Sequence, residues 1–372
     1  MSIDICIKKG VNIKLEGTAE RVYANIETPD NYMVKPSDFP GLIPKLSVKI
    51  GDKVQAGSSL FFDKENPSVT ISSPVSGEIS EIRRGEKRKI LAIVIKADAK
   101  ITYKEFPKAE AKNLSRDKII EQMLESGLWP FVRQRPYAVI ANPTDMPKAI
   151  FISAFDSAPL ACDNDFVLHG MEKEFQAGLD IVTKLTKGKT HLNIEGNSNS
   201  SSVFTSAKNV QINNISGPHP AGNIGVQIHH IDPINKGEIV WYMYPQDVIA
   251  IGRLFTEGIY DATRLIALSG SQVKKPRYYR TMQGASISSM TKGNIKEGNN
   301  RFISGNVLTG TKIEAEGHLG FYNYEITVIP EGKEQDFLGW LLPGLNKYSL
   351  SRTFFSWLSP KKRIYYICKY EW

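Results

Sequence analysis

The sequence predicts a multidomain α+β protein, because the pattern of apolar residues changes twice along its 372 residues. Residues 3–97 alternate apolar and polar side chains in short runs separated by Gly and Pro, as strands and turns do. From Ser115 to Gly258, strand-like runs alternate with helical spacing, which indicates a layered α/β unit. From Arg264 to Gly332, short strand-like runs with Gly turns return. A chain of this length can bury several separate cores.

The first β-rich region has the layout of a biotinyl or lipoyl carrier domain. Gly51 and Gly57 separate short strands, and a Pro-Val-Ser-Gly motif at 74–77 follows a hairpin tip. A carrier presents a modifiable lysine at that tip, but the corresponding position here falls near Asn66. An asparagine cannot form the amide to biotin or lipoate, so we expect a structural or docking module. Attachment of an acyl group at nearby Lys64 is the alternative.

The middle region is expected to alternate helices and strands. Ser115 is a favourable N-cap and Gly127 a favourable stop for a helix between them. The other expected elements are strands at 149–155, 189–194, 210–215 and 239–244 and helices at about 164–186 and 245–258. Ligands of α/β layers bind beyond the carboxyl ends of the strands, so site residues are expected in the loops there.

The loop at 125–133 contains one glycine, Gly127, followed by two large aromatic residues. A phosphate cradle needs several glycines, so that backbone N–H groups can approach the anion. This loop is therefore a poor pyrophosphate site. Trp129 and Phe131, with Arg133 after them, form either an apolar slot for a flat ring or core aromatics at a helix end.

Two further loops contain candidate residues. Asp156 directly follows a buried strand and either hydrogen-bonds a ligand or caps the next turn. His219 stands between Pro218 and Pro220, which restrict the backbone and hold the imidazole in one direction. It is either a ligand contact or part of a rigid structural loop.

Metal centres are not expected. His229, His230 and Asp232 are close in sequence, but neighbouring residues of a strand point to opposite faces and cannot converge on one ion. The three cysteines, Cys6, Cys162 and Cys368, form no CxxC pair for zinc or an iron–sulfur cluster. We interpret them as reduced thiols.

The charge and hydropathy of the chain indicate a soluble, cytoplasmic protein. Its formal net charge of +8 comes mainly from basic clusters at 83–89, 274–280 and 361–363. No nucleic-acid-binding signature accompanies these clusters, so they are either solvated faces or contacts with a membrane surface or an acidic partner. The longest clean apolar run, at 90–95, is far shorter than the roughly 20 residues of a membrane-spanning helix. The N-terminus has no signal-peptide pattern.

Many segments together resemble one family. They are IKKGVNIKLEGTAE, GDKVQAGSSLFFDKENPSVTISSPVSGEISEIRRGEKR, LESGLWPFVRQRP, AIFISAFDSAPLA, GPHPAG, YPQDVIAIGRLF, KKPRYYRTMQGAS, ISGNVLTG and LGWLLPGLNKYS. In this order they are similar to the A subunit of the bacterial sodium-translocating NADH:quinone oxidoreductase, over about residues 3–359.

The resemblance implies four regions. They are a barrel-sandwich hybrid domain of the biotinyl/lipoyl type at 1–100, a Rossmann-like α/β domain at 113–258, a β-grasp domain of the soluble-ligand-binding (SLBB) type at 262–332, and a C-terminal helical or irregular segment at 333–372 that is truncated relative to the family.

The resemblance also implies a peripheral subunit on the cytoplasmic face of the bacterial inner membrane. Its complex would move sodium ions while electrons pass from NADH to ubiquinone or menaquinone. In flavin-binding relatives the loop aligned with 127–133 is rich in glycine, and the loop aligned with 156–159 carries glutamates. Both patterns are absent here. We therefore expect no catalytic residue and no cofactor in this subunit, with NADH, flavins and an iron–sulfur cluster in the partner subunits, and an inactive isolated chain.

Quinone binding is the one ligand function expected of the chain. The quinone-binding candidates are Trp129, Phe131, Arg133, Asp156 and His219. An independent flavin-dependent NADH dehydrogenase is the alternative function.

Overall fold

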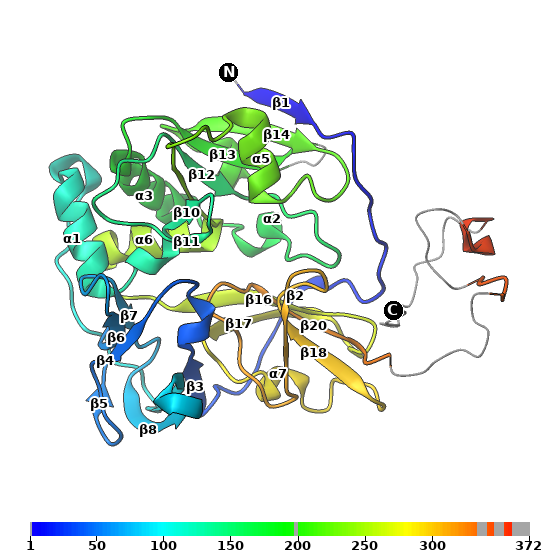
Figure 1. Ribbon diagram of the computed structural model, residues 1–372, viewed down its shortest axis with the longest axis horizontal. Coiled ribbons are helices and arrows are strands. Elements are labelled where there is room, and N and C mark those ends of the chain that lie inside the picture. Colours follow the sequence, from blue (N-terminus) through cyan, green and yellow to red (C-terminus); the bar gives the residue numbers. More distant parts are fainter. Residues whose placement is uncertain (1, 197–199, 333–340, 346–352, 359–372) are drawn as a thin grey trace.

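The computed structural model describes residues 2–196, 200–332, 341–345 and 353–358 (Figure 1). Within these ranges the strands form a seven-stranded sheet, a six-stranded sheet, and two smaller sheets of four and three strands. The two smaller sheets make up a barrel. The seven-stranded sheet and its helices lie above the barrel and the six-stranded sheet in the view of Figure 1.

Short antiparallel strands form the barrel. Its first sheet has the order β3 (Asn31–Val34), β9 (Ile90–Ala97), β8 (Gly77–Arg84) and β5 (Lys53–Val54), and its second β4 (Pro44–Leu46), β6 (Ser59–Asp63) and β7 (Thr70–Ser72). Ile71, Ile79 and Ile93 are fully buried between the sheets. The predicted hairpin tip lies between β6 and β7, where the Ser68 hydroxyl donates to the side chain of Asn66. A non-carrier residue thus occupies the tip.

The strand order of the seven-stranded sheet reverses at one point. Its order is β1 (Ile3–Cys6), β14 (Gln211–Ser216), β13 (Thr190–Glu195), β12 (Ile150–Ser153), β15 (Val240–Met243), β10 (Arg133–Arg135) and β11 (Val139–Ile140). The first five strands run parallel, β10 pairs antiparallel with β15, and β11 pairs antiparallel with β10. From β12 the chain adds β13 and β14 on one side and β15 on the other. This places a topological switch point between β12 and β15.

Helices cover both faces of this sheet. They are α1 (Arg116–Ser126), α2 (Asn164–Val167), α3 (Glu172–Val182), α4 (Ser202–Thr205), α5 (Ile224–Ile231) and α6 (Pro245–Glu257). α5 packs on the face that carries Phe151 and Tyr242, while α3 and α6 pack on the face that carries Ile152 and Leu192. α3 and α6 approach closely because Gly178 lies between them: a Cβ atom there would come within 2.0 Å of the Val248 carbonyl oxygen.

Several predicted elements are confirmed. The Ser115 hydroxyl caps α1, and Gly127 ends it with a left-handed φ of 77° that favours glycine. α6 begins at Pro245 and ends before Gly258. The predicted strands correspond to β12, β13, β14 and β15.

Two predictions about this region are wrong. The single helix expected at 164–186 is divided into α2, α3 and a 3-10 helix (Thr183–Leu185), because Gly170 takes a φ of 81° that interrupts the helical backbone. His229 and His230 lie on α5 rather than on a strand. In the part of the chain that the structure describes, no three His, Cys, Asp or Glu side chains gather as a metal site would require.

The six-stranded sheet has the order β19 (Thr311–Ile313), β18 (Asn300–Ser304), β20 (Glu325–Pro330), β16 (Thr263–Ser269), β17 (Arg277–Met282) and β2 (Glu20–Ala24), with α7 (Ser288–Thr291) packed beside it. The β-rich character expected from Arg264 to Gly332 is therefore confirmed. The remaining short helices are 3-10 helices at Pro36–Asp38, Glu86–Arg88, Ala111–Asn113, Trp129–Phe131 and Phe355–Leu358.

The first 24 residues contribute to the two large sheets and not to the barrel. β1 pairs with β14 and β2 pairs with β17, and the connecting arm runs along the side of the molecule (Figure 1). The boundaries 1–100, 113–258, 262–332 and 333–372 stay a prediction. Of the last region, 341–345 and 353–358 are described, and the rest of that prediction lies outside the described residues.

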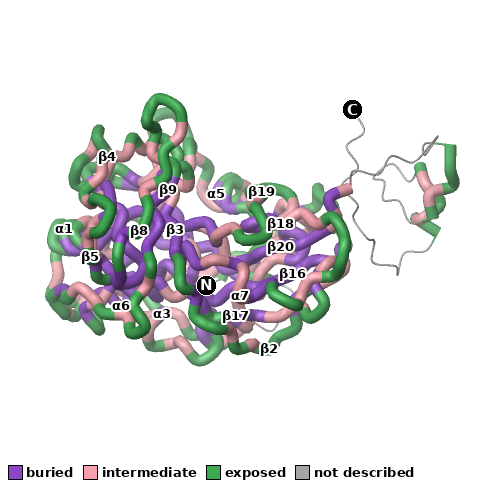
Figure 2. Tube along the Cα trace, turned by 90° about the horizontal axis from the view of Figure 1, so that it is seen from below, coloured by how far each residue is buried: buried purple, intermediate pink, exposed green. Residues whose placement is uncertain are grey.

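The three bodies share one apolar core. One cluster of buried side chains runs from the barrel through the α/β layer to the six-stranded sheet, and Figure 2 shows buried stretches in each of these parts. Phe321 contacts both Phe39 of the barrel region and Phe131 of the α/β layer, with ring centroids 4.7 and 5.1 Å away. None of the helices in the described ranges has the length and apolar content needed to span a membrane.

Candidate functional site

A cavity of about 590 Å³ lies at the switch point of the seven-stranded sheet. Ser153 at the end of β12 and Tyr242 of β15 line it from the sheet. The loops 305–309 and 322–324 and the start of β20, all of the six-stranded sheet, close its other side. We call it the switch-point cavity. Open α/β sheets bind ligands at this place, and interdomain clefts of this size accept small molecules.

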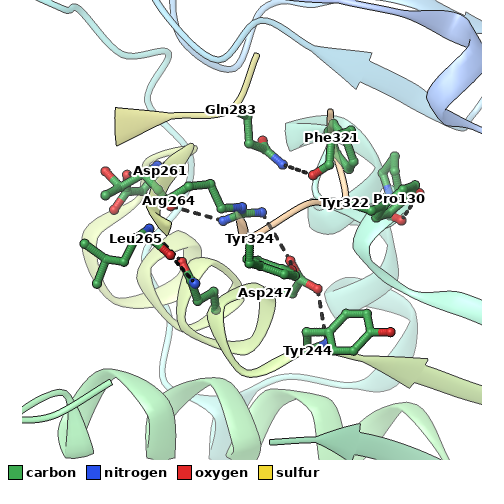
Figure 3. Close-up of polar contacts among 12 residues, drawn as sticks. Pro130, Tyr244, Asp247, Asp261, Arg264, Leu265, Gln283, Phe321, Tyr322 and Tyr324 are labelled. Carbon is green, nitrogen blue, oxygen red and sulfur yellow. Dashed lines mark hydrogen bonds and ion pairs between the residues drawn. The ribbon is translucent and has the colours of Figure 1, made fainter. Parts of the chain in front are cut away.

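Tyrosine rings form much of the wall. Tyr242, Tyr244, Tyr322 and Tyr324 all line the cavity. Tyr244 makes edge contacts with Tyr242 and Tyr324, with centroids 6.2 and 5.7 Å away. The Tyr322 hydroxyl donates to the Pro130 carbonyl oxygen at 2.8 Å (Figure 3). Burial raises the pKa of Tyr242 and Tyr322, so both remain neutral at pH 7.

Two arginines of β10 supply the positive charge of the cavity. The Arg133 guanidinium lies 4.4 Å from the Tyr322 ring centroid and 5.1 Å from that of Tyr242. Arg135 lies 5.4 Å from the Tyr242 centroid. In the described structure the buried Nε atoms of both arginines have no hydrogen-bond partner. They are donors held over aromatic rings, a favourable arrangement for guanidinium groups.

The start of α5 forms a third side. Gly222, Asn223 and Gly225 line the cavity there. Gly222 is required by packing, because a Cβ atom at this position would lie 2.1 Å from the backbone nitrogen of Ser157. The first N–H groups of a helix have no partner within it, so this end of α5 is a source of further donors.

A buried amide network holds the loop before α5 in place. The Gln227 side-chain nitrogen donates to the carbonyl oxygen of Gly222 at 3.2 Å, and its oxygen accepts from Asn193 at 2.8 Å. Asn213 donates in turn to Asn193 at 2.8 Å. The network connects β13 and β14 to the edge of the cavity.

Two carboxyl groups complete the lining. Asp156 caps the turn after β12 by accepting the backbone N–H of Ala158 at 2.8 Å. Desolvation raises the pKa of Asp156, but its side chain is exposed, and solvent therefore keeps it ionised at neutral pH. Glu325, the first residue of β20, is buried at the opposite wall.

The structure brings together only two of the five predicted candidates. Arg133 and Asp156 line the switch-point cavity. Trp129 and Phe131 are completely buried, and the Trp129 indole donates to the Ala141 carbonyl oxygen at 2.7 Å. His219 faces Ser157, with Nδ1 3.1 Å from its hydroxyl oxygen, and does not line the cavity.

The slot expected beside Trp129, Phe131 and His219 is therefore not formed by these side chains. Trp129 and Phe131 are instead core aromatics at a helix end, and His219 belongs to a rigid loop. The complete burial of Trp129 and Phe131 fits the structural alternative, whereas a ligand contact by the half-buried His219 stays a prediction.

Sequence reasoning missed most of the wall and the amide that supports it. The missed residues are Arg135, Gly222, Gln227, Tyr242, Tyr244, Tyr322, Tyr324 and Glu325. Tyr242 and Tyr244 had a local signal, because they end a predicted strand on the ligand side of the sheet. Glu325 and its neighbours are distant in sequence, and no local pattern associates them with β12.

Comparison with known proteins agrees with this architecture. Three family models match the chain: the NqrA N-terminal barrel-sandwich hybrid domain at residues 5–98, the NqrA second alpha/beta domain at 114–260, and the NQRA C-terminal domain, of SLBB type, at 265–315. The A subunit of the Na(+)-translocating NADH-quinone reductase of Pasteurella multocida (strain Pm70) is 38% identical over 360 residues, which cover 96% of this chain and 80% of that protein. The chain belongs to the NqrA family.

Another NqrA protein, from Yersinia pestis bv. Antiqua (strain Angola), is 39% identical over 363 residues, with the same coverage of both chains. The resemblance found from the sequence motifs is confirmed. Among solved structures, the NAD+-reducing NiFe-hydrogenase in its air-oxidised state is 13% identical and covers 62% of this chain and 52% of that chain. Its TM-score of 0.40 is too low to support any argument.

Proposed function

We propose that this subunit of a sodium-translocating NADH:quinone oxidoreductase binds the quinone ring in the switch-point cavity. The place of the chain in the complex follows from membership of the NqrA family, whose members from Pasteurella and Yersinia are A subunits of Na(+)-translocating NADH-quinone reductases. No observation favours the alternative, an independent flavin-dependent NADH dehydrogenase.

The composition of the cavity wall is the observation that carries the proposal. A quinone presents a flat ring with two carbonyl oxygens that accept hydrogen bonds. The rings of Tyr242 and Tyr322 offer flat surfaces, and Arg133 holds donors between them. Pockets for such ligands combine apolar walls with a few well-placed polar groups. Ubiquinone and menaquinone share this ring chemistry.

We also propose that the subunit carries no flavin and no bound NADH. Gly127 is the only glycine of the loop 125–133, and the Trp129 and Phe131 side chains that follow it are completely buried. This supports the loss of a phosphate cradle there. The partner subunits would then hold the flavins and the iron–sulfur cluster, and the isolated chain would be inactive. The finer labels, Rossmann-like for the α/β domain and β-grasp for the SLBB-type domain, are proposals of the same kind.

The subunit is proposed to sit peripherally on the cytoplasmic face of the inner membrane, in contact with other subunits. Exposed apolar side chains near the C-terminal end of the described chain support such contacts. They are Leu341, Leu342, Leu345, Phe355, Trp357 and Leu358, each at least half exposed. Apolar residues gathered in this way are typical of interaction surfaces.

Equilibrium binding of a short-chain, water-soluble quinone to the isolated chain tests the cavity proposal. Replacement Arg133→Met keeps an unbranched apolar stem and removes the donors of the guanidinium group. Loss of a hydrogen bond from a charged donor costs about 1.5–3 kcal/mol, so we expect affinity to fall roughly tenfold to a hundredfold.

His219→Gln is the matched control, because His219 lies on a neighbouring loop outside the cavity. We expect its affinity to equal that of the wild type. Absence of saturable binding by the wild-type chain, with ubiquinone and menaquinone analogues alike, would overturn the proposal. Equal weakening by both replacements would also do so.

A further inference from the structure

We infer that Glu325 is protonated in the folded protein and that its Oε2–H donates a hydrogen bond to a carbonyl oxygen of the ligand in the switch-point cavity. The first half of this inference concerns the protein alone. The second half rests on the proposed function and names the residue that would recognise one end of the quinone.

Glu325 is buried but faces the cavity. It is the first residue of β20, paired with Ala267 of β16, and only 5% of its surface is exposed. The residue nevertheless lines the cavity together with Cys162 and Asp156. Among the described residues, Oε2 has no hydrogen-bond partner. An unpaired polar atom this deeply buried is costly unless something in the cavity bonds to it.

The groups around Glu325 disfavour its ionised form. The titratable groups that face it are Asp156, Cys162 and Tyr278, and none of these is a cation. Burial raises the pKa of Glu325 well above its usual range, and the Asp156 carboxylate raises it further. The backbone N–H of Cys162 offsets only part of this effect. The carboxyl group is therefore neutral at pH 7 and has one O–H donor.

A neutral acid at this wall gives the cavity donors on two sides. Arg133 and Arg135 of β10 offer N–H groups on one side, and Glu325 offers an O–H group on the other. A ring with two carbonyl acceptors can use both sides. An anionic group at the Glu325 end would lie near the Asp156 carboxylate and be repelled. The arrangement selects a neutral carbonyl there.

Two variants separate hydrogen-bond donation from charge. Glu325→Gln keeps a neutral donor of similar length but cannot ionise, and Glu325→Met keeps the length and has no donor. In the infrared difference spectrum between the wild type and Glu325→Gln at pH 7, we expect the C=O band of a protonated carboxylic acid. This measurement needs no ligand. Carboxylate bands in its place would overturn the inference.

The binding arm uses the same water-soluble quinone across a pH series. At neutral pH we expect Glu325→Gln to bind within about threefold of the wild type and Glu325→Met to bind about tenfold more weakly, the effect of one lost neutral hydrogen bond. Wild-type affinity should fall at alkaline pH as Glu325 ionises, whereas the affinity of Glu325→Gln should not. Unfolding curves check that each variant folds, and Glu325→Gln alone decides the pH effect if Glu325→Met does not.

The outcomes distinguish the two proposals. If the wild type binds quinone and Glu325→Met binds equally well, only the role of Glu325 fails. If quinone affinity falls equally at alkaline pH in the wild type and in Glu325→Gln, again only the role of Glu325 fails. If the wild type does not bind, the cavity proposal fails together with the ligand half of this inference, while the infrared band still decides whether Glu325 is protonated.

Discussion

A buried ion pair between Arg264 and Asp247 joins the six-stranded sheet to helix α6 of the α/β layer, and its removal is predicted to destabilise the protein strongly. Arg264 belongs to β16 and Asp247 to the first turn of α6. Their side chains are 1% and 2% exposed, with Nη2 and Oδ1 3.1 Å apart. Asp247 also accepts from the Tyr324 hydroxyl at 2.7 Å and from the Tyr244 backbone N–H at 3.1 Å (Figure 3).

The expected size of the effect follows from this burial. Arg264→Met removes the guanidinium group that lies over the Phe131 and Tyr324 rings, and it leaves the Asp247 carboxyl buried without its cation. Breaking a buried pair on one side costs about 3–5 kcal/mol. At about 3 kcal/mol, the midpoint of thermal unfolding would fall by roughly 4 °C, because an unfolding entropy of about 2.1 cal/mol/K per residue is large for a chain of this length.

The loss should also depend on pH. Burial already raises the pKa of Asp247, and the Arg264 guanidinium offsets part of that rise. Without Arg264 the pKa of Asp247 rises further, so the folded variant binds a proton that the unfolded chain has released. Stability then falls as the pH increases from the ordinary pKa of an aspartate towards the raised value. The loss of unfolding free energy in Arg264→Met, relative to the wild type, should therefore be larger at pH 7 than at pH 5.

Differential scanning calorimetry of four proteins tests the reasoning. They are the wild type, Arg264→Met, the double variant Asp247→Leu/Arg264→Met, and Arg83→Met as a control. Arg83 pairs with Glu81 on the surface, where both side chains are 50% exposed, and its loss should cost at most about 1 kcal/mol. The double variant should be more stable than Arg264→Met, because no unpaired charge remains. Equal losses in Arg264→Met and Arg83→Met, or a double variant less stable than Arg264→Met, would refute the argument.

Three further predictions concern the cavity, a buried histidine and the absence of cofactors. Gly222→Ala should lower both thermal stability and quinone affinity, because the added Cβ would lie 2.1 Å from the Ser157 backbone nitrogen. Gly225→Ala should be tolerated, because its added Cβ would have its nearest neighbour at 3.9 Å. Similar melting points for the two variants would contradict the packing argument. Desolvation lowers the pKa of His191 from 6.5 to about 4. The stability that the neutral, buried imidazole contributes is therefore complete above pH 6.5 and is lost as the pH falls from 6.5 to about 4. The wild type should therefore lose roughly 2 kcal/mol more than His191→Gln between pH 7 and pH 5 in urea titrations, and parallel curves would exclude this role. The purified chain should be colourless, should not oxidise NADH, and should have the intact mass of its sequence; visible flavin absorption near stoichiometry, or an acyl group on Lys64, would contradict the cofactor-free assignment.

Local signals were sufficient to locate most elements. Ser115 and Gly127 bound α1, and Pro245 and Gly258 bound α6, because caps and stops act through backbone groups a few residues away. The change from a two-residue to a helical apolar period marks the α/β layer for the same reason. Family membership was also readable from the motifs, since they are runs of adjacent residues.

The switch-point cavity could not be located in this way. Its wall joins Arg133, Tyr242 and Glu325, which come from strands of two different sheets. An apolar pattern indicates that a residue is buried, but not which distant surface covers it. Trp129 therefore suited both a ligand slot and a core, and only its contacts with Trp241 of β15 and with Ala141 after β11 place it in the core. Likewise, nothing near β1 or β2 in the chain shows that they pair with strands 210 and 255 to 257 positions away, because strand pairing is selected by the whole fold.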